Sequence, residues 1–125
     1  MLHGGGVSQR AFIHGRDVST AIQKLMFVAK TGQIYHFSES QIYSIAEVVH
    51  KIATISGFDP NAVVETTKDR PGKDNRYFMD TKKAQADLGW TTAVDFETGL
   101  LDVAQWIEAN IDEFKTLSLE YNHVS

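Results

Sequence analysis

The chain has 125 residues, 42% of them hydrophobic and 22% charged, and it contains no cysteine. This length and composition predict a single globular domain over residues 1–125 and exclude a two-domain protein. The lack of cysteine excludes disulfides and thiol nucleophiles, and a formal net charge of -4 argues against general affinity for nucleic acid. No apolar stretch is long enough to cross a membrane and no signal sequence is evident, so we expect a cytoplasmic protein.

The first third of the chain predicts a strand followed by a helix. Three consecutive glycines, Gly4–Gly6, indicate a flexible turn, and residues 7–14 have the pattern of a strand. Asp17 stands where an N-cap belongs, ahead of an apolar-rich run over residues 18–29. This run predicts a helix that ends at Gly32.

The middle of the chain carries the clearest local signal. Residues 33–37 predict a short strand, and Ser44 with Glu47 three positions later forms a capping box. Apolar residues then recur at helical spacing, which predicts a helix over residues 45–55 that ends at Gly57.

Three further elements are predicted in the second half. Residues 62–66 have a strand pattern, Asp80 can cap a short helix that Gly89 ends, and Asp95 can cap a long last helix. The element order is then β-α-β-α-β-α-α. This order predicts an α/β protein with a small mixed sheet and about four helices.

A hydrolase and a metal site are both poorly supported. The string from His3 to Gly6 occurs in the oxyanion loops of some esterases. Ser8, however, lacks the glycine-x-serine-x-glycine turn of such enzymes, because Arg10 stands where the second glycine belongs. No two of the five histidines have the helical spacing, with a glutamate between them, that a zinc site uses, so we expect no metal.

A basic loop contrasts with the acidic background of the chain. Four cations fall within nine residues, around a proline-glycine pair that can bend the backbone: Lys68, Arg70, Lys73 and Arg76. Guanidinium groups bind phosphate oxygens in a bidentate way, so the loop is a candidate anion site. A solvated surface loop without a specific ligand explains the same residues.

The residues around this loop resemble a known family. The run Asp69-Arg70-Pro71-Gly72-Lys73 and its surroundings resemble the C-terminal part of nucleotide-sugar 4,6-dehydratases, and are most like the dTDP-glucose 4,6-dehydratases. These enzymes belong, with the sugar epimerases, to the extended short-chain dehydrogenase/reductase (SDR) family. The resemblance covers essentially the whole chain, and its order and spacing are specific. The matching segments are residues 10–17, 33–37, 69–77, 80–84, 88–90 and 96–100.

The resemblance implies a binding site for the diphosphate of a nucleotide sugar. Arg10 and Arg70 would hold the diphosphate, and Lys73 would lie near the ribose. His36 occupies a strand position that is often asparagine in relatives, and it completes the predicted set of substrate-binding residues. Relatives often carry aspartate or histidine in place of Lys73, so the identity of the nucleotide stays open.

Two features of the complete enzymes are missing from the sequence. Enzymes of this family hold NAD at a glycine-rich strand-to-helix turn, and Gln9 stands where a third spaced glycine would be needed after Gly4–Gly6. No tyrosine is followed four residues later by the lysine of the family's catalytic pair. The resemblance thus implies an incomplete extended-SDR fold that lacks the N-terminal Rossmann half. Such a chain would bind no NAD alone and would have no catalytic residue of its own.

Two interpretations of the function remain. In the first, the chain is the substrate-binding portion of such an enzyme, non-catalytic alone, with a nucleotide diphosphate sugar as its ligand and no nucleic-acid or membrane partner. In the second, the sugar site is a relic and the chain is a self-associating interaction module. Because apolar residues of the 18–29 run extend beyond one stripe, we expect a homodimer or larger assembly, or a separately encoded N-terminal half as partner.

Overall fold

A computed structural model shows an α/β fold in which five short strands form two sheets, within the described residues 1–69 and 72–118. One sheet has the order β3-β2-β5, and the other pairs β1 with β4. The predicted small mixed sheet is confirmed, although its strands divide between two sheets. The strands are β1 (Leu2–His3), β2 (Gln9–Ala11), β3 (Ile42–Ser44), β4 (Thr66–Thr67) and β5 (Arg76–Tyr77).

The central strand β2 is paired on both sides. It runs antiparallel to β3, with Arg10 opposite Tyr43, and parallel to β5, with Arg10 opposite Tyr77. The pairing with the β3 side extends one residue beyond β2, because the backbone nitrogen of Ile45 donates a hydrogen bond of 3.0 Å to the carbonyl of Ser8. The strand predicted over residues 7–14 is therefore real but shorter than expected.

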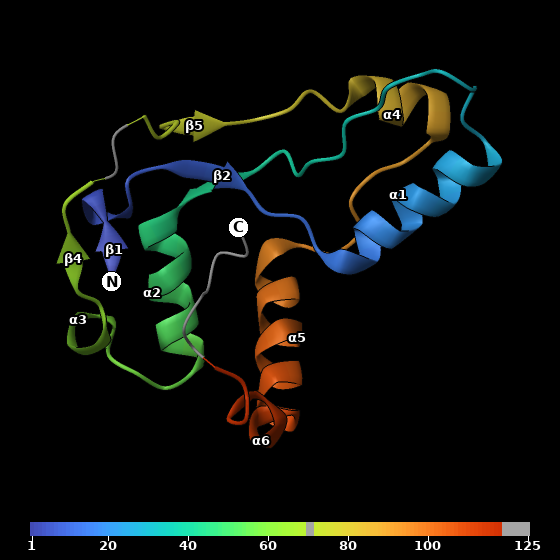
Figure 1. Ribbon diagram of the computed structural model, residues 1–125. Coiled ribbons are helices and arrows are strands. Elements are labelled where there is room, and N and C mark those ends of the chain that lie inside the picture. Colours follow the sequence, from blue (N-terminus) through green and yellow to red (C-terminus); the bar gives the residue numbers. More distant parts are fainter. Residues whose placement is uncertain (70–71, 119–125) are drawn as a thin grey trace.

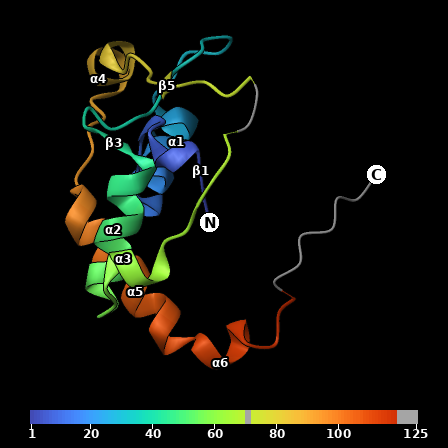
Figure 2. The same ribbon diagram turned by 90° about the vertical axis from the view of Figure 1, so that its left-hand side faces the viewer.

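Four of the helices form two pairs (Figure 1). Helices α2 and α5 stand side by side near the three-stranded sheet, whereas α1 and α4 lie together at the other end. The short α6 follows α5 and lies far from the sheets (Figure 2). The helices are α1 (Gly15–Phe27), α2 (Ile45–Ile55), α3 (Pro60–Val63), α4 (Lys82–Leu88), α5 (Phe96–Ala109) and α6 (Ile111–Phe114).

Local capping signals set the starts of α2 and α5, as predicted. The hydroxyl of Ser44 accepts a hydrogen bond of 3.1 Å from the backbone nitrogen of Glu47, whose carboxylate accepts one of 2.7 Å from the backbone nitrogen of Ser44. The carboxylate of Asp95 accepts a hydrogen bond of 2.9 Å from the backbone nitrogen of Thr98. Both predicted helix starts are therefore confirmed.

Three predicted elements differ from the structure. Residues 33–37 belong to no strand; two of their aromatic side chains, Tyr35 and Phe37, pack against the buried cluster instead. The strand predicted over 62–66 is wrong in its first half, because Asp59 caps helix α3, which runs to Val63, and strand β4 covers only Thr66–Thr67. The long last helix breaks at Asn110, after which α6 begins.

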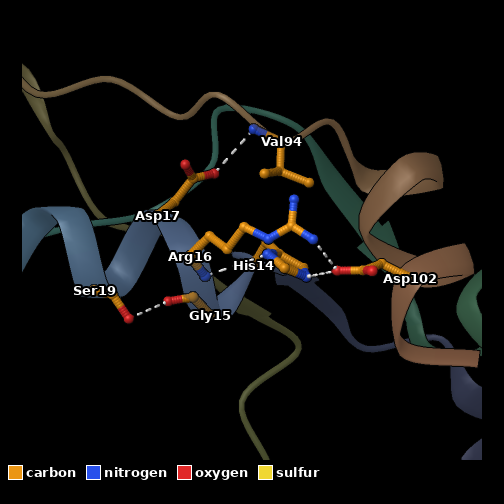
Figure 3. A network of polar contacts seen from close by, with 7 residues as sticks. All are labelled: His14, Gly15, Arg16, Asp17, Ser19, Val94 and Asp102. Atoms are coloured by element: carbon orange, nitrogen blue, oxygen red, sulfur yellow. Dashed lines mark hydrogen bonds and ion pairs between the residues drawn. The ribbon is translucent and has the colours of Figure 1, made fainter. Parts of the chain in front are cut away.

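His14, and not Asp17, caps helix α1. The ring nitrogen Nδ1 of His14 accepts a hydrogen bond of 3.2 Å from the backbone nitrogen of Arg16. Nε2 of the same ring lies 3.3 Å from the carboxylate of Asp102 on α5, to which the Arg16 guanidinium donates at 2.8 Å (Figure 3). The ring therefore links the start of α1 to α5.

Asp17 has a different structural role from the cap that the sequence predicts. It lies in the first turn of α1, is 3% exposed, and accepts hydrogen bonds at its two carboxylate oxygens from the backbone nitrogens of Ala93 (3.0 Å) and Val94 (3.1 Å). The prediction was wrong because the histidine three residues earlier already caps the helix. The carboxylate thus holds the segment that leads into α5 against α1.

The buried cluster lies between α1 and α4, and it is small. It consists of Ala21, Ala84, Leu88 and Trp90. Several large apolar side chains lie outside this cluster and stay exposed, among them Met26, Phe27 and Trp106. Much apolar surface therefore stays uncovered. None of the helices in the described ranges is long and apolar enough to cross a membrane.

Candidate anion-binding site

A hollow of about 240 Å³ lies between the glycine turn, strand β2 and the start of α2. Two of the predicted site residues, Arg10 and Lys73, line it together although they are far apart in the sequence. Its other polar walls come from His3 and Ser8. Apolar residues and one glycine complete the lining: Met1, Leu2, Gly6 and Ile45.

The glycine turn shapes one wall of the hollow. Gly4–Gly6 form a 3-10 turn, η1, and the three residues have φ of 58°, 67° and 68°, a region that favours glycine. A Cβ on Gly4 would lie 2.4 Å from the carboxylate carbon of Asp69, and one on Gly6 would lie 2.8 Å from the backbone nitrogen of Ala46. The turn expected to be flexible is therefore a defined structure whose backbone approaches both the basic loop and α2.

Two backbone carbonyls hold the guanidinium of Arg10 in place. Nη1 donates a hydrogen bond of 2.7 Å to the carbonyl of Gln9, and Nη2 donates one of 2.9 Å to the carbonyl of Asp74. Neither acceptor is charged, and no carboxylate among the described residues forms an ion pair with Arg10. Burial raises the pKa of the hydroxyl of Tyr43, which lies opposite Arg10 in β3, above its already high ordinary value, so this side chain carries no negative charge near pH 7. The two carbonyls thus fix the position of the Arg10 guanidinium, and no described carboxylate neutralises its positive charge.

Lys73 contributes less free charge to the hollow. Its Nζ lies 2.5 Å from a carboxylate oxygen of Asp69, and its side chain is 19% exposed. Asp69 in turn packs against the backbone of Gly4. The ammonium is therefore compensated within the basic loop, and Arg10 is the stronger anion-binding group of the two.

The structure does not place the other two predicted site residues at the hollow. Arg70, predicted to share a diphosphate with Arg10, lies outside the described residues, and its role stays a prediction. His36 is exposed and is not among the residues that line the hollow. Its Nδ1 lies 3.3 Å from the sulfur of Met79. Met79 follows β5 in the chain, whereas Lys73, which lines the hollow, precedes it.

The sequence did not predict His3 and Ser8 as members of the site. His3 contacts the hydroxyl of Thr67 at 3.0 Å and the carbonyl of Lys68 at 3.3 Å. One signal could have found Ser8, because residues two apart in a strand share a face and Ser8 stands two before Arg10. His3 offered no such signal, since its placement depends on the distant strand β4.

The described residues do not fit an NAD molecule at the glycines. The pyrophosphate of a dinucleotide needs a helix N-terminus directly after the glycine-rich turn. Here η1 leads into strand β2, so the turn offers no such cradle. Within the same ranges, no group of three His, Asp or Glu side chains is placed to hold a metal ion.

Comparison with known proteins relates this arrangement to nucleotide-sugar enzymes. The sequence model of one family, described as GDP-mannose 4,6 dehydratase, matches residues 1–103. The chain is 33% identical over 110 residues to a dTDP-glucose 4,6-dehydratase of Mycolicibacterium smegmatis, a match that covers 87% of this chain and 33% of that protein. It is 30% identical over 109 residues to the dTDP-glucose 4,6-dehydratase of Streptomyces niveus, covering 87% and 32%.

The solved structures that resemble this chain include enzymes with the same name as these relatives. The dTDP-glucose 4,6-dehydratase of Bacillus anthracis in complex with NAD matches with a TM-score of 0.85 and 28% identity, over 94% of this chain and 36% of that chain. DesIV, a dTDP-glucose 4,6-dehydratase of Streptomyces venezuelae with NAD and TYD bound, matches with a TM-score of 0.84 and 28% identity, over 90% and 34%. The chain spans about a third of the length of these relatives.

Proposed function

Because this chain belongs to the GDP-mannose 4,6-dehydratase family of extended-SDR nucleotide-sugar enzymes, we propose that it binds the diphosphate of a nucleotide sugar. One observation carries the proposal: the guanidinium of Arg10 lines the hollow, held by two uncharged carbonyls, with no ion-pair partner among the described residues. A diphosphate is a dianion whose oxygens match the guanidinium geometry. Arg70 and Lys73 would add to the same ligand, and the substrate-binding role predicted for His36 stays a prediction.

In this proposal the chain is the substrate-binding portion of an NAD-dependent sugar 4,6-dehydratase or epimerase-like protein in the cytoplasm. It performs no turnover by itself and binds no NAD by itself, because the sequence lacks the cofactor turn and the tyrosine-lysine pair. Support comes from the similar proteins named above, which are about three times as long as this chain. Both of the solved structures named among them contain NAD. The remaining length of such an enzyme would supply the missing chemistry.

Calorimetric titration of the purified chain with dTDP, UDP, GDP and CDP tests the proposal. We expect at least one diphosphate to bind and Arg10→Ala to weaken that binding by roughly tenfold or more, the effect of a lost charge-assisted hydrogen bond. Lys115→Ala is the matched control, because Lys115 is an exposed cation that pairs with Asp112 on α6, away from the hollow. The proposal would be contradicted if none of the four nucleotides bound, or if Arg10→Ala bound a nucleotide as tightly as the wild type does.

A second candidate function, a self-associating interaction module with a relic sugar site, is favoured by the outer face of α1. That helix buries Asp17 and Ala21, whereas Val18, Ile22 and Met26 form an exposed apolar stripe at four-residue spacing. Phe27 beside the stripe is 83% exposed. Such a face suits a homodimer or larger assembly, or a separately encoded N-terminal half. Light scattering separates an associating chain from a monomeric one.

A further inference from the structure

Ser8 differs from the other buried polar residues of the described chain in having an unsatisfied hydroxyl. The buried polar residues are Ser8, Asp17 and Ser38, each less than a tenth exposed. Asp17 accepts two backbone hydrogen bonds, and the Ser38 hydroxyl donates one of 3.2 Å to the carbonyl of Glu39. The hydroxyl of Ser8 has no hydrogen-bond partner among the described residues. Burying a hydroxyl in this state destabilises a fold, so its presence calls for a compensating role.

Ser8 is also placed at the candidate site. It lines the hollow together with Arg10 and Lys73. The carbonyl of Ser8 accepts a hydrogen bond from the backbone nitrogen of Ile45, so Ser8 continues the pairing of β2 with β3. Ser8 stands two residues before Arg10, and the alternation of side chains in extended backbone puts both on one face. A serine side chain has three staggered positions about χ1, so its hydroxyl reorients without any movement of the backbone.

We propose that the Ser8 hydroxyl donates a hydrogen bond to an oxygen of the diphosphate that Arg10 binds. This inference rests on the proposed function of the hollow. A hydroxyl that donates to an anionic oxygen makes a shorter and stronger hydrogen bond than one between neutral groups. The Ser8 hydroxyl, which has no partner among the described residues, then gains one in the complex. The same side chain therefore destabilises the ligand-free fold and stabilises the complex.

Ser8→Ala tests the inference through two effects of opposite sign. Without ligand, the variant should melt at a higher temperature than the wild type, because it removes an unsatisfied buried hydroxyl. In calorimetry with the diphosphate that the wild type binds, its affinity should fall about tenfold. Ser38→Ala is the matched control: it removes a buried hydroxyl that has a partner, so it should melt at a lower temperature and bind with unchanged affinity.

The outcomes separate this inference from the proposed function. If the wild type binds a diphosphate and Ser8→Ala binds it equally well, the inference is overturned and the proposed function stands. If the wild type binds none of the four nucleotides, the proposed function fails and the inference fails with it. Should Ser8→Ala not fold, Ser8→Cys replaces the hydroxyl by a weaker donor on the same Cβ, and wild-type affinity in that variant overturns the inference equally.

Discussion

The indole nitrogen of Trp90 donates a hydrogen bond of 3.0 Å to the backbone carbonyl of Asp17, a residue 73 positions earlier in the chain. The Trp90 ring is 1% exposed and packs edge-on against Phe37 at 4.9 Å between ring centres. The carboxylate of Asp17 also accepts hydrogen bonds from the backbone nitrogens of Ala93 and Val94, the second of which Figure 3 shows. This aspartate therefore joins α1 to residues 90–94 through both its carbonyl and its carboxylate.

Asp17→Ala should lower the free energy of unfolding by about 2–3 kcal/mol, since it removes two hydrogen bonds to a buried carboxylate and leaves two amides without a partner. Asp17→Asn keeps one acceptor oxygen and should lose roughly half as much. Urea unfolding measures the difference. Asp112→Ala, at a side chain 93% exposed, is the control and should be nearly neutral. Equal effects of Asp17→Ala and Asp112→Ala would contradict the structural role given to Asp17.

The glycine turn predicts a difference between two neighbouring substitutions. Gly5→Ala meets no atom within 4 Å and should cost only the strain of a left-handed residue, about 1–2 kcal/mol. Gly6→Ala has the same strain and also brings its Cβ to 2.8 Å from the backbone nitrogen of Ala46, so it should cost roughly 1–3 kcal/mol more. Urea midpoints of both variants test this order. A Gly6→Ala variant as stable as Gly5→Ala would show that the turn is as flexible as the sequence suggested.

Acid should weaken the helix starts. The backbone amide and hydroxyl of Ser44 hold the pKa of the Glu47 carboxyl below its ordinary value, and hydrogen bonds from Thr98 lower the pKa of Asp95 in the same way. A carboxyl whose pKa is lower in the folded than in the unfolded protein stabilises the fold. This contribution is fully present above the pKa of the unfolded protein, about 4 for these groups, and is lost as the pH falls through the pKa of the folded protein. Glu47→Gln should therefore lose less stability than the wild type between neutral pH and about pH 3. Identical losses in urea titrations at the two pH values would refute the link to Glu47.

Catalysis is expected to be absent from the purified chain. With NAD and dTDP-, UDP- or GDP-linked sugars, no 4-keto product should form, because η1 leads into a strand and no tyrosine-lysine pair stands in the sequence. Absorbance of the 4-keto product is the assay, with a complete dehydratase as positive control. Turnover that persists through further purification would show that the chain contains chemistry that its sequence does not reveal.

Association should depend on the apolar face of α1. Light scattering is expected to report a dimer or larger species at micromolar concentration, because several large side chains stay exposed along one helix. Phe27→Asp should shift the chain towards monomer, while Gln23→Asp, on the same helix at an exposed polar position, should not. A well-folded wild-type monomer at high concentration would remove the support for the second candidate function.

Elements that depend on neighbouring residues could be predicted from the sequence. The capping box at Ser44 and Glu47 and the cap at Asp95 are local, and the helices that they start are present. The strand predicted over 62–66 begins too early, because the branched residues Val63 and Val64 favour a strand, while Asp59 and Pro60 favour the helix start that is present. The two-residue strands β1 and β5 have too little periodicity to be recognised, whereas β2 lies within the strand predicted over residues 7–14.

The site was predictable in part. Arg10 and Lys73 were identified through resemblance to a family, and the structure brings both to one hollow. His36 came from the same resemblance and lies elsewhere in the described structure. The unsatisfied hydroxyl of Ser8 could not be predicted, because whether a buried group finds a partner depends on distant segments.

Parallel pairing of β2 with β5 has a consequence for the order of folding. Gln9 pairs with Arg76, and in the second sheet Leu2 pairs with Thr66, so neither parallel pair can form until most of the chain is available. Closing such long loops is slow relative to helix formation, and we expect α1 and α2 to form before these strands meet. The hollow, with Ser8 on one side and Lys73 on the other, is then assembled late. A ligand bound there should slow unfolding and leave the folding rate nearly unchanged.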